Sequence, residues 1–252
     1  MKSRFTWNRI AQCVVILAGV FALKLHYSTA SADQLRWILA PTTALVELVS
    51  GASFEFESRA GYISRERGFL IAGSCAGVNF LITAFLMLSI RNALGDRSKK
   101  AAWSFIPVAA VIAYLTTLVA NATRIAIALL LRQSTSEGAG WMSPEQLHRF
   151  EGVFIYFGFL LLLFGAGEKL SAEKTSNPFR SSLFPLLVYY AMMLGVPLLN
   201  GAYRQGADFW RHAIFVLLIP LPLTLGWLTL TSWSPKRPAA CSAKRSRSTA
   251  EC

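Results

Sequence analysis

The chain has 252 residues, of which 54% are hydrophobic and only 15% are charged. Soluble domains usually carry about 25% charged residues, so this composition excludes a single globular domain in water. The formal net charge of +12 would suggest a nucleic-acid partner in a soluble protein, but basic residues also collect on the cytoplasmic loops of membrane proteins. The four cysteines show neither CxxC spacing nor a metal-like pairing with the three histidines. We therefore expect no nucleic-acid partner, no disulfide framework, no metal and no cofactor.

Charges are missing from four long stretches of the chain. Residues 68–90, 101–123, 181–203 and 213–235 each run 23 residues without Asp, Glu, Lys or Arg. About 20 apolar residues are enough to cross the roughly 30 Å of bilayer hydrocarbon as a helix. The sequence therefore predicts an all-α fold, a polytopic integral membrane helical bundle in contact with the lipid bilayer.

The N-terminal region combines three early basic residues with an uncharged run over residues 10–23. With the small residues at 30–32, this pattern imitates a cleavable signal peptide. Lys24 and the polar residues after it favour an uncleaved first span, although the sequence leaves cleavage open. Residues 35–50 contain Pro41 and only a short apolar run, which predicts an interfacial or re-entrant segment rather than a crossing.

The distribution of basic residues predicts the orientation of the bundle. Six crossings are expected, at about residues 10–26, 69–90, 102–124, 150–167, 183–200 and 211–231. The segments on the side of the two termini then hold 15 basic residues, and the opposite segments hold 8. Because basic residues favour the cytoplasmic side, both termini are expected to be cytoplasmic. Residues 1–234 form the membrane domain, and residues 235–252 are expected to be a basic, disordered cytoplasmic tail.

The first polar feature within these spans is a cysteine among small residues. Cys75 stands in the run Gly73-Ser74-Cys75-Ala76-Gly77, expected about two turns into the second span from its outer end. Gly73 and Gly77 form a GxxxG pattern, which lets another helix approach closely. A small cysteine that only packs in a tight helix contact is the commoner interpretation of such a residue.

The second feature is an arginine near the end of a long apolar helix. Residues 101–131 carry a single charge, Arg124, and Asn121 lies three residues earlier, on the same helix face. An arginine near a span end can also reach the headgroups by snorkelling, without any function. The neighbouring Asn121 favours an arginine that is held by protein groups.

The third feature is a histidine just after a helix start. Ser143 and Gln146 form a capping box with a proline at the first helical position, so a helix should begin there. His148 falls in its first turns, with Glu151 and Gly152 on the same face. A helix N-terminus disfavours the imidazolium and leaves a neutral imidazole available as a base. A surface histidine at a membrane interface is the alternative, and it is the only interpretation for the two other histidines, His26 and His212.

The predicted topology brings these three features together. Helix-rise arithmetic places Cys75, Arg124 and His148 at one membrane face, within about 10 Å of one depth. A thiol, a guanidinium and an imidazole are the components of a nucleophile, an anion stabiliser and a base.

Three short sequence blocks resemble the signature blocks of the exosortase/archaeosortase family, most closely the compact exosortase K type. The blocks are Cys75-Ala76-Gly77, Asn121-x-x-Arg124-Ile125, and His148 followed by Gly152, and the resemblance covers residues 60–167. It implies a bacterial inner-membrane cysteine peptidase or transpeptidase that cleaves the C-terminal sorting signals of membrane-anchored exported proteins at the periplasmic side. By this resemblance Cys75 is the nucleophile, His148 the general acid/base, and Arg124 the stabiliser of the oxyanion. We expect Asn121, Glu151 and Gly77 to surround these three residues.

A non-enzymatic membrane protein is the alternative class. An assembly scaffold, a lipid-binding subunit or a small permease would explain the apolar spans and the charge distribution, and it would not need Cys75. The sequence leaves open the substrate motif, the acceptor that resolves the intermediate and the oligomeric state.

Overall fold

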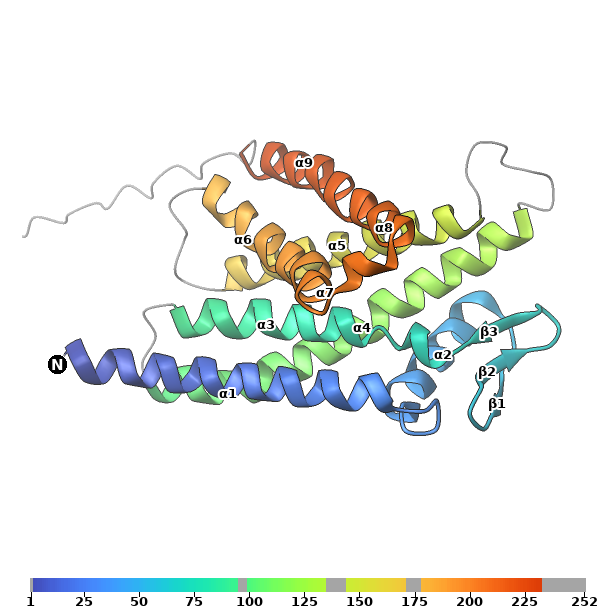
Figure 1. The fold of residues 1–252 in the computed structure, drawn as a ribbon, viewed down its shortest axis with the longest axis horizontal. Coiled ribbons are helices and arrows are strands. Elements are labelled where there is room, and N and C mark those ends of the chain that lie inside the picture. The colour runs from blue at the N-terminus through green and yellow to red at the C-terminus, as the bar shows by residue number, and fades with distance from the viewer. Residues whose placement is uncertain (1, 95–98, 135–143, 171–177, 233–252) are drawn as a thin grey trace, which may run out of the picture.

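The computed structural model describes residues 2–94, 99–134, 144–170 and 178–232, and within them helices dominate (Figure 1). The helices are α1 (Lys2–Thr29), α2 (Arg36–Ser50), α3 (Val78–Leu94), α4 (Lys99–Ser134), α5 (Pro144–Leu170), α6 (Pro178–Tyr190), α7 (Val196–Leu199), α8 (Ala207–Leu218) and α9 (Pro220–Ser232). Two single 3₁₀ turns, η1 (Gly73–Ala76) and η3 (Ala202–Gln205), and a π-helical segment, η2 (Ala191–Gly195), connect some of them. The predicted tail, residues 235–252, lies outside the described residues.

Five helical segments are long and apolar enough to cross a membrane, which confirms an all-α polytopic bundle. They are Trp7–Thr29, Gly73–Ala93, Trp103–Leu131, Arg149–Lys169 and Phe209–Thr231. The sixth predicted crossing, at 183–200, corresponds to a shorter apolar helix, Leu183–Leu199. The helical run of which it is part begins at Pro178, includes the π-helical segment η2 and ends at Leu199, one residue from the predicted end. Its crossing of the membrane stays a prediction.

Two groups of helices build the bundle. In the first, α3 packs against α1 and α4, and α2 lies along α4. In the second, α5, α6 and α8 pack against α9. Helix α5 also contacts α3 and α4, which joins the two groups (Figure 1). A continuous buried core runs through both groups, with Phe80, Ile125 and Phe157 among its large side chains.

Residues 36–50 form one helix, α2, with Pro41 inside it. Its 15 residues rise about 22 Å, too little to cross the hydrocarbon alone. Helix α2 buries Ile38 and Leu39. Tyr114 of α4 stacks on the Trp37 ring at 5.8 Å between centroids and donates a hydrogen bond of 2.7 Å to the Trp37 carbonyl. A non-crossing helix fits the prediction for this segment, and its interfacial or re-entrant position stays a prediction.

A small antiparallel sheet, which the sequence analysis did not predict, precedes α3. Strands β1 (Glu55–Glu57), β2 (Gly61–Ser64) and β3 (Phe69–Ile71) pair in the order β1-β2-β3 at one end of the bundle (Figure 1). Gly61 has φ 124°, and a Cβ there would clash with the Ile71 carbonyl oxygen, so glycine is required at this close approach. Strand β3 leads through Ala72 directly into η1, and the sheet therefore positions the segment that carries Cys75.

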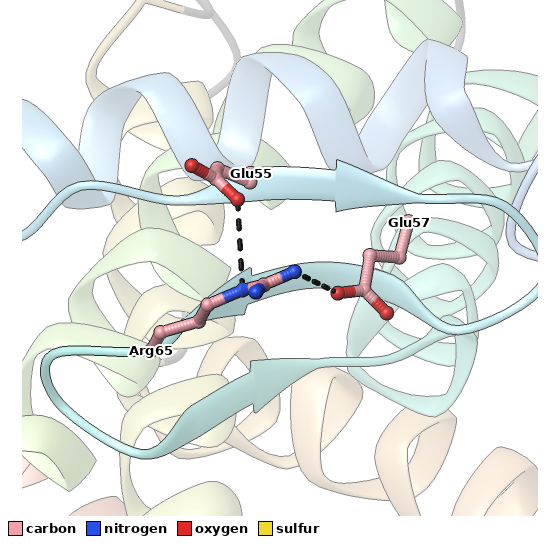
Figure 2. Close-up of polar contacts among 3 residues, drawn as sticks. All are labelled: Glu55, Glu57 and Arg65. Carbon is pink, nitrogen blue, oxygen red and sulfur yellow. Dashed lines mark hydrogen bonds and ion pairs between the residues drawn. The ribbon is translucent and has the colours of Figure 1, made fainter.

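Ion pairs and hydrogen bonds hold this sheet. Arg65, just after β2, lies 3.0 Å from Glu57 and 3.6 Å from Glu55 (Figure 2). These groups are exposed, so each pair contributes at most about 1 kcal/mol. The Arg59 backbone N–H and the Ser58 hydroxyl each donate to the Asp33 carboxylate at 2.9 Å, and they hold the pKa of Asp33 below its usual value. This contact ties the first turn of the sheet to the link between α1 and α2.

The contact between α5 and α9 depends on a glycine. A Cβ added at Gly165 would lie 2.7 Å from Cη2 of Trp227, so the indole would have to move. We expect Gly165→Ala to destabilise the bundle by about 1–3 kcal/mol, as overpacking does, and to lower the unfolding midpoint in detergent. Gly158→Ala is the matched control, because Gly158 lies in α5 with nothing within 4 Å of an added Cβ. Equal midpoints for both variants would contradict this packing.

Candidate active site

Cys75 lies on η1, the single 3₁₀ turn between β3 and α3. Its backbone N–H donates to the Ala72 carbonyl at 2.8 Å, and its side chain is partly buried. Gly77 follows with φ 70°, and helix α3 starts at Val78. The prediction that Cys75 sits two turns inside a helix is therefore wrong, as is the interpretation of Gly73 and Gly77 as one GxxxG helix face. The left-handed Gly77 ends the turn, which places the thiol at the head of α3.

Asn121 of α4 anchors the 3₁₀ turn that carries Cys75. Its side chain is 0% exposed on α4, and its Nδ2 donates a hydrogen bond to the backbone carbonyl of Cys75. Its Oδ1 accepts a hydrogen bond of 2.8 Å from the Tyr156 hydroxyl of α5. A Cβ at Gly77 would lie only 3.1 Å from Cγ of Asn121. Asn121 and Gly77 therefore contact the cysteine turn, and one buried amide joins η1, α4 and α5.

Arg124 lies one turn after Asn121 and points into the protein. It is 8% exposed, and its guanidinium interacts electrostatically with the Cys75 side chain. The guanidinium carbon lies 5.3 Å from the centroid of the Tyr156 ring, a cation–π distance. A snorkelling arginine would leave its charge at the headgroups, whereas this one is buried over an aromatic ring inside the bundle.

Besides Tyr156, helix α5 brings Glu151 and Gly152 next to Arg124. Glu151 is 6% exposed, and its carboxylate interacts electrostatically with the guanidinium. A Cβ at Gly152 would lie 3.8 Å from Cδ of Arg124, so the arginine packs against this glycine. Glu151, predicted to surround the three reactive residues, is therefore adjacent to Arg124. A buried carboxylate near a buried cation offsets part of the cost of removing that charge from water.

His148 lies in the first turns of α5, which begins at Pro144 as the capping pattern predicts. Its imidazole lies outside the described part of the structure. The described neighbours on the same helix, Arg149, Glu151 and Gly152, flank the site. The role of His148 stays a prediction that depends on this position.

A cavity of about 260 Å³ lies beside the cysteine turn and reaches Arg124. Ser74, Gly77 and Asn79 line it near η1, and Tyr156 and Gly152 line it from α5. The C-terminal helices complete the wall with Tyr189, Met193 and His212. Sequence reasoning missed these last three residues, and the only sequence signal for them was a histidine close to an apolar span.

The geometry groups Cys75 and Arg124 with Asn121, Glu151 and Gly77 at one end of the bundle. Residues 9–165 match the family described as transmembrane exosortase. The chain belongs to this family. The match includes Cys75, Arg124 and His148, and it starts earlier than the expected range of 60–167. It ends within α5, so the C-terminal helices of this exosortase lie outside it.

The likeness to the exosortase K type stays a prediction. No match to the chain is found among curated proteins or among solved structures. Among the described residues of this exosortase, no group of three or more His, Cys, Asp and Glu residues is placed to hold a metal ion.

Proposed function

We propose that this exosortase is a membrane-embedded cysteine peptidase and transpeptidase. Its substrates are exported proteins anchored by a C-terminal sorting signal, and it cleaves them at the periplasmic face of the bacterial inner membrane. The observation that carries this proposal is the buried Arg124 guanidinium, which interacts electrostatically with the Cys75 side chain and lines a cavity beside the turn that carries Cys75. Family membership supports the same activity.

Arg124 is the cation proposed to assist the Cys75 thiol as a nucleophile. Thiolate is the nucleophilic form of cysteine, and apolar surroundings suppress it unless a cation is close. The guanidinium at the Cys75 side chain supplies this cation. After attack, negative charge moves from sulfur to the carbonyl oxygen of the substrate, and the fork of N–H donors on Arg124 can follow it.

The reaction then proceeds in two halves. The Cys75 sulfur forms a bond to the scissile carbonyl carbon, and collapse of the tetrahedral intermediate breaks the C–N bond and leaves a thioester. His148 is the group proposed to protonate the leaving amine. An incoming amine that attacks the thioester completes transpeptidation, and water completes hydrolysis.

Co-expression tests this function. The chain is produced with a membrane-anchored exported protein that ends in a short motif, an apolar helix and a basic cluster. We expect a smaller form of that protein only when the chain is present, with its new C-terminus before the helix. An unchanged size for every such partner encoded near this chain would contradict a peptidase.

The topology is a separate prediction from the basic-residue counts. Reporter fusions in residues 91–100, 168–180 and the tail should report cytoplasm, and fusions in 51–68, 132–149 and 201–210 the outside. The positions are Arg97, Lys174 and Lys236 for the first set, and Arg59, Ser136 and Gln205 for the second. A cytoplasmic signal at Ser136 would place His148 on the wrong side for the proposed reaction.

Gly77, at the end of the turn that carries Cys75, tests whether the backbone shape of this turn matters for cleavage. Gly77→Ala introduces a residue that is disfavoured at φ 70° by about 1–2 kcal/mol and pushes on Asn121. A displacement of about 1 Å at a reacting group can cost roughly 100-fold, so we expect cleavage to slow at least about tenfold per folded molecule. Gly51→Ala is the control, with φ 67° and nothing within 4 Å of an added Cβ. Equal cleavage rates in the two variants would remove Gly77 from the site.

A further inference from the structure

We infer that the C-terminal helices form a substrate-selecting wall, and that His212 is a specificity-determining residue of it. In this inference, His212 donates a hydrogen bond to the peptide segment next to the scissile bond. We define the C-terminal wall as Tyr189, Met193 and His212, the residues by which α6, η2 and α8 line the cavity. This inference rests on the proposed peptidase function and adds to it residues outside the region shared with the family.

Contacts between neighbouring helices hold the residues of the C-terminal wall together. Met193 lies within the π-helical segment η2, and π-helical turns occur frequently at functional sites. The Tyr190 hydroxyl donates a hydrogen bond of 2.8 Å to the Leu217 carbonyl, which ties the end of α6 to α8. Tyr189 is buried and packs edge-on against Phe157 of α5 at 5.2 Å between ring centroids. These contacts hold His212 at a set position relative to Tyr156 and Arg124.

The cavity has a volume of about 260 Å³. The inference assigns it to the peptide segment next to the scissile bond, which enters as extended chain or as a single side chain.

The polar groups of the cavity indicate how that segment is held. Arg124, Arg149 and His212 all line it, together with the tyrosine side chains. No aspartate or glutamate is among the residues that line this cavity in the described part of the chain. A lining of donors and cations is complementary to hydrogen-bond-accepting oxygens, which an extended peptide offers along its backbone. His212 contributes a donor from α8, outside the matched residues 9–165.

Cross-linking tests the position of the substrate. In a background with Cys13, Cys241, Cys252 and Cys75 all changed to serine, His212→Cys is combined with single cysteines placed along the substrate near its cleavage site. We expect copper-phenanthroline oxidation to join position 212 to one or two adjacent substrate residues. Ile214→Cys is the control, because Ile214 lies on the same helix and is 53% exposed on the outer surface of the bundle. Equal cross-linking at the two positions would overturn the inference.

Kinetics test the role of the imidazole. His212→Phe keeps a ring without a donor, and the loss of one hydrogen bond to substrate predicts a KM higher by about three- to tenfold with kcat nearly unchanged. His212→Gln restores a donor and should recover most of the affinity. A normal KM for His212→Phe, with cleavage by the unaltered chain, would overturn this inference and leave the peptidase function standing. If the unaltered chain cleaves no substrate, the proposed function fails and this inference fails with it.

Discussion

Replacing Cys75 with alanine is expected to abolish cleavage of the substrate while the protein still inserts and folds. The thiol is the only group of this side chain that the proposed chemistry uses, and loss of a covalent nucleophile typically costs on the order of 10⁴-fold or more in rate. The measurement is the ratio of cleaved to full-length substrate in cells that accumulate equal amounts of each variant.

Cys13→Ala provides the matched control for this experiment. Cys13 is also a partly buried free cysteine within a candidate span, but it lies on α1 about 21 Å along the helix from Tyr27, the residue by which α1 lines the cavity. We expect Cys13→Ala to cleave as the unaltered chain does. If Cys75→Ala also cleaves normally, the chain is not a cysteine peptidase, and a scaffold or a permease explains the bundle better.

Arg124→Lys is expected to insert and accumulate normally and yet leave the substrate largely uncleaved. Lysine keeps the positive charge, but it does not have the planar fork of donors that can hold a thiolate and then a carbonyl oxygen. Losing one well-placed oxyanion donor typically costs about 100- to 1000-fold in rate, or about 3–4 kcal/mol. The initial rate of cleavage in proteoliposomes measures this effect.

Arg91→Lys controls for the general cost of such a change. Arg91 also stacks on an aromatic ring, with its guanidinium carbon 4.7 Å from the centroid of Phe164. It lies near the C-terminal end of α3, at the opposite end of that helix from Cys75. We expect Arg91→Lys to retain cleavage. Near-normal cleavage by Arg124→Lys would remove Arg124 from the catalytic group and leave Cys75 with His148 at most.

The sequence predicted those parts of the fold that depend on local chemistry. Runs without charge indicated the apolar helices, and the capping pattern located the start of α5 at Pro144. Asn121 and Arg124 lie on one helix face because their spacing of three residues requires it. Asn121 donates a hydrogen bond to the Cys75 carbonyl, and Arg124 interacts electrostatically with the Cys75 side chain. These inferences need only helix geometry and the cost of burying charge.

The features that the sequence did not predict depend on contacts between distant segments. The strands before α3 have only three or four residues each, too few for a periodic pattern, and they form by pairing with one another. The turn at Cys75 ends at Gly77, which adopts φ 70° and lies close to the Asn121 side chain. An uncharged run in the sequence does not indicate where such a turn ends. The placement of His212 at the cavity depends on how α8 packs against the rest of the bundle.

The central claim is that Cys75 becomes covalently attached to substrate, and capture of that intermediate tests it most directly. The purified chain is mixed in proteoliposomes with a substrate whose cleavage site is established, without an added amine acceptor, and quenched in acid. Peptide mass spectrometry should then find the N-terminal part of the substrate on Cys75 as a thioester that hydroxylamine releases, and Arg124→Lys should lower its amount. Substrate cleavage that continues with no adduct on Cys75, or with the adduct on another residue, would contradict the account.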